Sequence, residues 1–113
     1  MVVVTLEVAT REQANERFLR ALEGEILGDF ISFKSPEVLF KFISGKRWEL
    51  LKAMTGVGAM TIREAARRTG RGVKEVHRDV QALLKAGILR KTQDRLIVFP
   101  FDAVHVDFML KAE

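Results

Sequence analysis

The chain has 113 residues, of which 48% are hydrophobic and 30% charged, with a net charge of +4, two histidines and no cysteine. This composition predicts one soluble globular domain with terminal extensions, and it excludes disulfides, thiolate metal sites and an intrinsically disordered chain. Because no apolar run reaches the roughly 18 residues that span a bilayer, and residues 1–9 do not resemble a signal peptide, we expect a cytoplasmic protein without metal or cofactor.

The N-terminal segment predicts a strand and a helix. Residues 2–8 are β-branched and roughly alternating, which favours a strand. Thr10 and Gln13 form a capping box at the start of a helix over 11–23. The apolar stripe of this helix consists of Ala14, Phe18, Ala21 and Leu22.

An extended piece and two more helices follow. After the extended piece at 30–33, Ser35 is the expected N-cap of a helix over 36–43. The small pair at 44–45 breaks that helix, and a third helix covers 47–54. Its buried side is expected to carry Trp48, Leu51 and Met54.

Two short helices joined by a tight glycine turn are the most informative part of the sequence. Thr61 and Glu64 form a capping box for a helix that ends near Gly70. A longer helix over 72–86 starts only a few residues later. Its core stripe is expected to consist of Val73, Val76, Val80, Leu83 and Leu84, bordered by His77.

The remaining residues predict a hairpin and a last strand. Two β-prone runs, 88–91 and 95–99, flank a short polar segment, which is typical of a hairpin. The run 104–110 alternates apolar and polar residues and predicts a final strand that pairs with the first one.

These elements predict an α+β fold in three parts. A winged helix-turn-helix unit is expected at 35–100, because helix, glycine turn, longer helix and hairpin follow in its order. A strand and helix at 1–34 precede it and are candidates for a homodimer contact, and a C-terminal strand at 101–113 follows it.

Positive charge is concentrated in the middle of the chain. Residues 44–95 hold 13 Lys and Arg against 5 Asp and Glu, whereas residues 1–43 hold 5 against 7 and residues 96–113 hold 1 against 3. A basic segment between two mildly acidic ends is typical of a module that binds a polyanion, although a solvated basic face gives the same count.

Helix 72–86 is therefore predicted to enter the major groove of double-stranded DNA, with Arg78 as the first choice for a base contact. The residues predicted to bind DNA are Arg71, Lys74, Arg78, Lys85, Arg90, Lys91, Gln93 and Arg95. The hairpin cations have an alternative role, since charge on a hairpin also prevents aggregation through its edge.

Several charged residues near this surface keep more than one interpretation. Glu75 either accepts from cytosine N4 or pairs with Arg71 or Arg78, and the pairing is favoured. Asp79 is expected to point away from DNA and to pair within the protein. Two cations at the start of the third helix either touch phosphate or are only solvated: Lys46 and Arg47.

A family resemblance rests on three runs: Lys46 to Leu51, Thr61 to Ala66, and Val76 to Leu83 followed by Gly87 and Ile88. Over about residues 33–100 the chain resembles winged helix-turn-helix transcriptional regulators of the MarR-like kind, and most closely a group of small predicted DNA-binding proteins of bacteria and archaea. The resemblance implies a repressor or autoregulator. Some similar proteins look like antitoxins that also bind a small toxin. The chain departs from full-length MarR proteins in lacking their long terminal dimerisation helices.

Two other classes of function compete with DNA binding. Catalysis is not expected, because no nucleophile and base lie at a meaningful spacing and no glycine-rich phosphate loop is present. A winged helix can also serve as a protein-interaction module, but such a module would not need a row of cations on one helix face.

Overall fold

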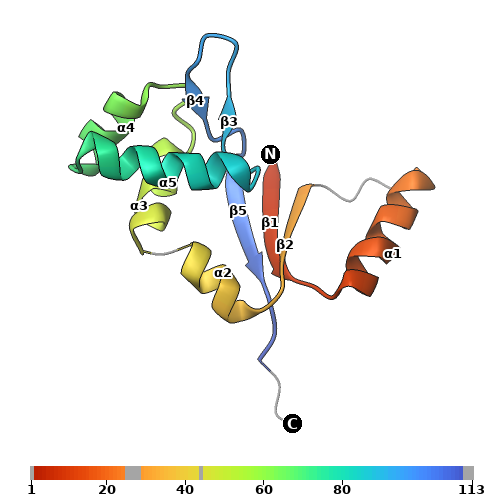
Figure 1. The fold of residues 1–113 in the computed structure, drawn as a ribbon. Coiled ribbons are helices and arrows are strands. Elements are labelled where there is room, and N and C mark those ends of the chain that lie inside the picture. The colour runs from red at the N-terminus through yellow and green to blue at the C-terminus, as the bar shows by residue number, and fades with distance from the viewer. Residues whose placement is uncertain (1, 25–28, 44, 111–113) are drawn as a thin grey trace. The chain divides into compact units, whose positions relative to one another are not determined.

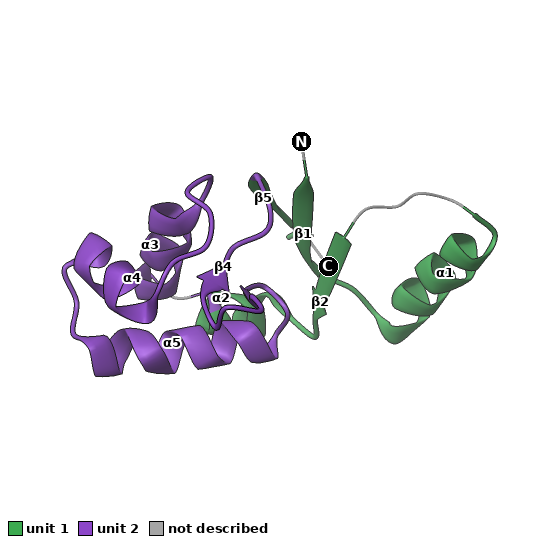
Figure 2. Ribbon diagram, turned by 90° about the horizontal axis from the view of Figure 1, so that it is seen from above, with its two compact units in different colours: residues 1–42, 103–113 green, residues 43–102 purple. Residues whose placement is uncertain are grey.

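The computed structural model describes residues 2–24, 29–43 and 45–110 (Figure 1). The chain forms two compact units, one made of residues 1–42 with 103–113 and the other of residues 43–102 (Figure 2). Each unit contains helices and a sheet, so the fold is α+β. The boundaries predicted from the sequence lie at 34/35 and 100/101. None of the described helices is long and apolar enough to cross a membrane.

The first unit is built on a parallel sheet. Its elements are β1 (Val3–Val8), α1 (Arg11–Leu22), β2 (Asp29–Phe33), α2 (Pro36–Phe42) and β5 (Ala103–Asp107). The strand order is β2-β1-β5, and β1 pairs in parallel with both neighbours, so that Val4 lies opposite Asp29 and Val104. The predicted pairing of the last strand with the first is therefore confirmed. Val4 and Leu6 of the central strand are fully buried.

Helix α1 begins as predicted but packs differently. Both halves of its capping box are present: Thr10 Oγ1 accepts from the N–H of Gln13 at 3.1 Å, and Gln13 Oε1 accepts from the N–H of Thr10 at 2.9 Å. The predicted apolar stripe does not contribute to the core, because no residue of α1 is buried. The stripe residues Phe18 and Leu22 are 63% and 68% exposed.

The second unit contains three helices and a hairpin. Its elements are α3 (Gly45–Met54), α4 (Ile62–Thr69), α5 (Val73–Lys85), β3 (Arg90–Lys91) and β4 (Ile97–Val98). Ser44, half of the predicted helix break, lies outside the described residues. Helix α4 contacts both α3 and α5. The core of the unit consists of Leu50, Leu51, Met54, Met60, Ala65, Ala66, Val76, Val80, Leu83, Ile88, Leu89, Ile97, Phe99 and Phe101.

Local signals in the sequence explain how α4 and α5 are joined. Thr61 Oγ1 accepts from the N–H of Glu64 at 3.0 Å and caps α4. Gly70 ends α4 in the left-handed conformation (φ 66°, ψ 29°), which glycine adopts without strain, and Gly72 is already the N-cap of α5. The small residues Ala65 and Ala66 are buried, which allows the helices to pack closely.

Two of the predicted core stripes in this unit need correction. In α3 the inward face carries Arg47 with Leu50, Leu51 and Met54, whereas Trp48 is exposed. An arginine can occupy that face because Asp79 pairs with it.

In α5 the buried stripe is Val76, Val80 and Leu83. All three residues belong to the predicted stripe, but its centre is rotated away from Val73 and Leu84. Val73 and His77 are consequently exposed.

The hairpin is shorter than predicted but has a third partner. Arg90 pairs with Val98 and Lys91 with Ile97 in antiparallel register. Met60, just before α4, forms an antiparallel bridge to Ile97, with N–H to O distances of 2.9 and 2.8 Å. The base of the hairpin is thereby tied to the helices of the same unit.

Candidate functional site

Charge divides along the boundary between the two units. Residues 43–102 hold 13 Lys and Arg against 6 Asp and Glu, a net charge of +7, whereas the rest of the chain holds 6 against 9, a net charge of −3. The second unit is therefore the place to look for a site that attracts anions.

The acidic residues of the second unit neutralise one subset of its cations. Glu49 pairs with Lys52 at 3.7 Å, Glu64 pairs with Arg67 and Arg68, Glu75 pairs with Lys46 and Arg71, and Asp79 pairs with Arg47 and Arg71. Among the described residues of this unit, seven cations form no ion pair and all are exposed: Arg63, Lys74, Arg78, Lys85, Arg90, Lys91 and Arg95. We refer to these seven as the unpaired cations.

Arg71 lies at the centre of the ion pairs that join α3 to α5. Its Nη2 atom is 3.0 Å from Glu75 Oε1 and 2.6 Å from Asp79 Oδ2, and its side chain is only 12% exposed. Nη1 also donates to the backbone carbonyl of Lys46 at 3.4 Å. Lys46 and Arg47 reach the same two carboxylates from α3, at 2.7 and 3.1 Å. We call these five residues the Arg71 network.

The network stabilises the charged forms of its members. Hydrogen bonds from Lys46 and then from Arg71 hold the pKa of the Glu75 carboxyl below its ordinary value. Burial opposes the charged form of Arg71, but hydrogen bonds to Asp79 and Glu75 outweigh it, so that its pKa is raised. Glu75 and Arg71 therefore both stay charged at neutral pH.

This network decides between interpretations that the sequence left open. Glu75 pairs with Arg71, as favoured, and Asp79 pairs within the protein, as expected. Lys46 and Arg47 are engaged in ion pairs rather than only solvated. Arg71 differs from the other predicted DNA contacts, because its guanidinium is largely buried and already holds two carboxylates.

Three of the unpaired cations form a row along α5. At about 100° per residue, Lys74, Arg78 and Lys85 lie on the side directly opposite the buried stripe of this helix. Figure 2 shows α3 and α4 on one side of α5, so the row faces away from both. With a rise of 1.5 Å per residue, the row is about 16 Å long.

The hairpin carries the next group of unpaired cations. Thr92 closes its tip: the Thr92 carbonyl accepts from the N–H of Arg95 at 3.1 Å, and Oγ1 accepts from the N–H of Leu96 at 3.0 Å. Arg95 has a φ of 64°, the only positive φ of a non-glycine residue in the described part of the chain. Arg90 lies over the Phe101 ring, 5.5 Å from its centroid, and is thereby oriented. Gln93 and Lys91 are exposed.

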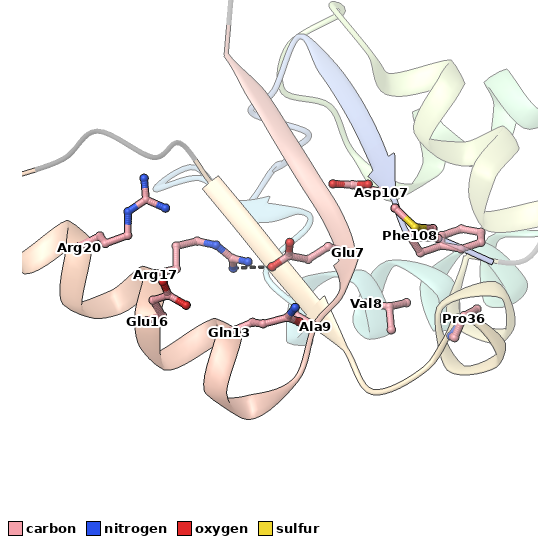
Figure 3. A pocket seen from close by; sticks show the side chains of 11 residues that line it. Glu7, Val8, Ala9, Gln13, Glu16, Arg17, Arg20, Pro36, Asp107 and Phe108 are labelled. Atoms are coloured by element: carbon pink, nitrogen blue, oxygen red, sulfur yellow. Dashed lines mark ion pairs between the residues drawn. The ribbon is translucent and has the colours of Figure 1, made fainter. Parts of the chain in front are cut away.

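The first unit contains a cavity of about 550 Å³ at the carboxyl ends of β1 and β5 (Figure 3). Glu7, buried at its edge, accepts from Ser32 Oγ at 3.1 Å and forms an ion pair with Arg17 of α1. Arg17 also stacks on the ring of Phe30, 4.2 Å from its centroid. Arg17 thereby connects α1 to β1 and β2 of the sheet. Across the described residues, no group of three His, Asp or Glu is arranged to hold a metal ion.

Comparison with known proteins places the chain in a family. The model of the HVO_A0114 family matches residues 42–106, which is more than half of the chain. The protein belongs to the HVO_A0114 family. No curated protein and no solved structure matches it.

The HVO_A0114 match takes in the whole second unit, with every unpaired cation, whereas β1, α1 and β2 lie outside it.

One unpaired cation of the HVO_A0114 region was missed by sequence reasoning. Arg63 lies in the first turn of α4 and is exposed. The sequence does contain a signal for this residue, because Arg63 is the second residue of a capped helix. Acidic side chains are usual in the first turn of a helix, and the helix dipole does not stabilise a cation there. Its acidic neighbour Glu64 is occupied by Arg67 and Arg68, which leaves Arg63 unpaired.

Proposed function

We propose that the protein binds double-stranded DNA through a winged helix-turn-helix formed by α3, α4, α5 and the hairpin, and that it regulates transcription. The observation that carries this proposal is the separation of charge within the second unit. Glu49, Glu64, Glu75 and Asp79 form ion pairs with cations of the helices and of the turn before α5. The unpaired cations lie on the outer face of α5, on the hairpin and at the start of α4. Such a surface attracts the phosphates of a duplex.

The dimensions of α5 support its role as the reading helix. Its outer row of cations is about 16 Å long, and the major groove is about 12 Å wide, so the two ends of the row reach the backbones when the middle reaches the bases. Lys74 and Lys85 therefore serve as phosphate contacts. Arg78, between them, is placed to donate two hydrogen bonds to O6 and N7 of guanine.

The hairpin supports the same proposal through an unfavourable conformation. Arg95 has a backbone that glycine would adopt at lower energy, yet it carries a long cationic side chain into solvent at the tip. A strained residue whose side chain forms no ion pair with the described residues is expected where a ligand makes use of it. Arg95 and Lys91 are therefore assigned to the DNA backbone, with Gln93 beside them.

The test is DNA binding measured by fluorescence anisotropy on a duplex selected from a random pool, with a scrambled duplex as reference. If four cations contact phosphate, the logarithm of the affinity falls with the logarithm of salt concentration with a slope of about −4. A protein-interaction module would show no such dependence. Arg95→Ala should weaken binding to both duplexes equally and reduce the slope by about one.

Arg78→Ala should instead reduce the preference for the selected duplex, by roughly 1–3 kcal/mol if its guanine contact is bidentate. Lys52→Ala is the matched control, since Lys52 is an exposed cation that pairs with Glu49 on α3. It should change neither the slope nor the preference. A folded Arg78→Ala variant that keeps the wild-type ratio between the two duplexes would show that α5 does not read the bases.

A further inference from the structure

Polar side chains of three neighbouring strands form a row at the carboxyl ends of the sheet in the first unit. The strand register places Ser32 and Asp107 opposite Glu7, one on either side of it. Because paired residues of parallel strands project from the same face, the three side chains lie side by side. Glu7 is the only polar or charged residue that is buried in the described part of the chain. In open parallel sheets, ligands bind outside this end of the strands.

The cavity of the first unit lies at the same end of the strands (Figure 3). Its volume of about 550 Å³ falls within the range of small-molecule sites, roughly 300–1,000 Å³. In addition to its charged groups, the cavity has an apolar lining made of Val8, Ala9, Pro36, Phe108 and Met109. It therefore suits a molecule that has both charged groups and an apolar stem.

The charged lining is negative overall, because three carboxylates and two guanidinium groups line the cavity. Glu7 is neutralised by its ion pair with Arg17, and Arg20 is the second cation. Glu16 of α1 and Asp107 of β5 form no ion pair with the described residues, and we call them the unpaired carboxylates. The whole unit has a net charge of −3. The cavity therefore attracts cations.

The positions of the unpaired carboxylates indicate what kind of cation fits. Figure 3 shows Glu16 on the helix and Asp107 on the strand, on opposite sides of the cavity. In the described part of the chain, no three His, Asp or Glu are grouped to hold a metal ion. A compact metal ion is therefore not matched, whereas a longer molecule with a cationic group at each end meets both carboxylates.

We infer that this cavity binds a linear aliphatic polyamine, with one ammonium group donating to Asp107 and another to Glu16. Its methylene chain contacts the apolar lining between them. Arg17 shows the same chemistry within the chain, since its guanidinium pairs with Glu7 and stacks on the ring of Phe30, 4.2 Å from its centroid. A ligand with a carboxylate or phosphate would instead bring a like charge beside the unpaired carboxylates.

The first experiment is isothermal titration calorimetry on the full chain without DNA. Polyamines bind the phosphates of DNA, so leaving DNA out makes the result independent of the proposed function. Linear diamines from ethylenediamine to octamethylenediamine are compared with butylamine, which has a single ammonium group. Affinity should pass through a maximum at one chain length, because both ends must reach fixed carboxylates. The best diamine should bind at least about tenfold more tightly than butylamine.

The second experiment repeats the titration of that diamine on variants of the unpaired carboxylates. Asp107→Asn and Glu16→Gln should each weaken its binding at least about tenfold and remove most of its advantage over butylamine. Glu12→Gln is the matched control, because Glu12 is an exposed acid in the first turn of α1 that does not line the cavity. It should leave the affinity unchanged.

Circular dichroism should show wild-type folding for all three variants, since each replaces an exposed acid by its amide. Three results would overturn the inference: no binding of any diamine at millimolar concentration, an affinity that does not depend on chain length, or binding that Asp107→Asn and Glu16→Gln leave unchanged.

Discussion

Replacing Arg71 with methionine tests whether this residue holds the second unit together or binds DNA. Methionine keeps an apolar stem of similar length but removes the charge and all donors. Arg71 is 12% exposed and contacts Glu75 and Asp79, whereas Arg78 on the same helix–turn segment is exposed and has no ion pair among the described residues. Arg78→Met is therefore the matched control.

The expected magnitude follows from burial and from the partners that remain. Removing one member of a buried ion pair costs about 3–5 kcal/mol, and an exposed pair contributes about 0–1 kcal/mol. Asp79 is 16% exposed but keeps Arg47, and Glu75 is more exposed and keeps Lys46. We therefore expect Arg71→Met to reduce the free energy of unfolding by about 2–3 kcal/mol, and Arg78→Met to change it by less than about 0.5 kcal/mol.

The assay is urea unfolding followed by circular dichroism at pH 7 without DNA. The double variant Arg71→Met/Asp79→Asn measures the coupling between the two side chains, which should be at least about 1 kcal/mol. If Arg71→Met costs no more than Arg78→Met, the Arg71 network does not join α3 to α5, and Arg71 returns to the set of candidate DNA contacts.

Two further substitutions test individual features of the second unit. Arg95→Gly should raise the free energy of unfolding by roughly 0.5–1 kcal/mol in urea, because glycine adopts a φ of 64° without strain, and a destabilised variant would contradict that geometry. Glu75→Gln tests the lowered pKa of this carboxyl. The ionised carboxylate stabilises the folded protein above its unfolded pKa of about 4.3. This stabilisation is lost as the pH falls through the pKa of the folded state. Wild type should therefore exceed the variant in stability at pH 7, with the difference shrinking below about pH 4; an unchanged difference at pH 3 would refute it.

Much of the element order was predictable because its signals are local. Caps such as Thr10 with Gln13, and Thr61 before α4, act within three residues, and the glycine turn at Gly70 needs no distant partner. The predicted helix bounds consequently agree with the observed ones to within two residues. Pairing of the first and last strands was also predictable, because both alternate and neither could bury its apolar side alone.

The site was only partly predictable because its ion pairs connect distant parts of the chain. Periodicity placed Trp48 on the inner side of α3, since a charged residue is not expected there. Arg47 can occupy that side only because Asp79, 32 residues further on, supplies its partner. Arg71 was placed among the exposed cations although its pairing with Glu75 was favoured, because the sequence does not reveal that Asp79 and the Lys46 carbonyl also bind its guanidinium.

Helix α1 shows a different limit of sequence reasoning. Its apolar stripe was correctly recognised, but a stripe does not reveal what covers it. The contact that ties the helix to the sheet is made by Arg17, which pairs with the buried Glu7 of β1. Because Glu7 lies in a strand and ten residues before Arg17, neither periodicity nor capping could predict that contact.

The position of the acids, more than the number of cations, gives the second unit its candidate binding surface. A net charge of +7 spread evenly over the unit would attract DNA without orienting it. Glu75 and Asp79 lie on the side of α5 that faces α3, where they neutralise the cations of the helix junction. The cations that remain unpaired lie on the outer row of α5, on the hairpin and at the start of α4. If the protein binds DNA as proposed, that arrangement favours one docking orientation, which is the condition for Arg78 to meet a particular base pair.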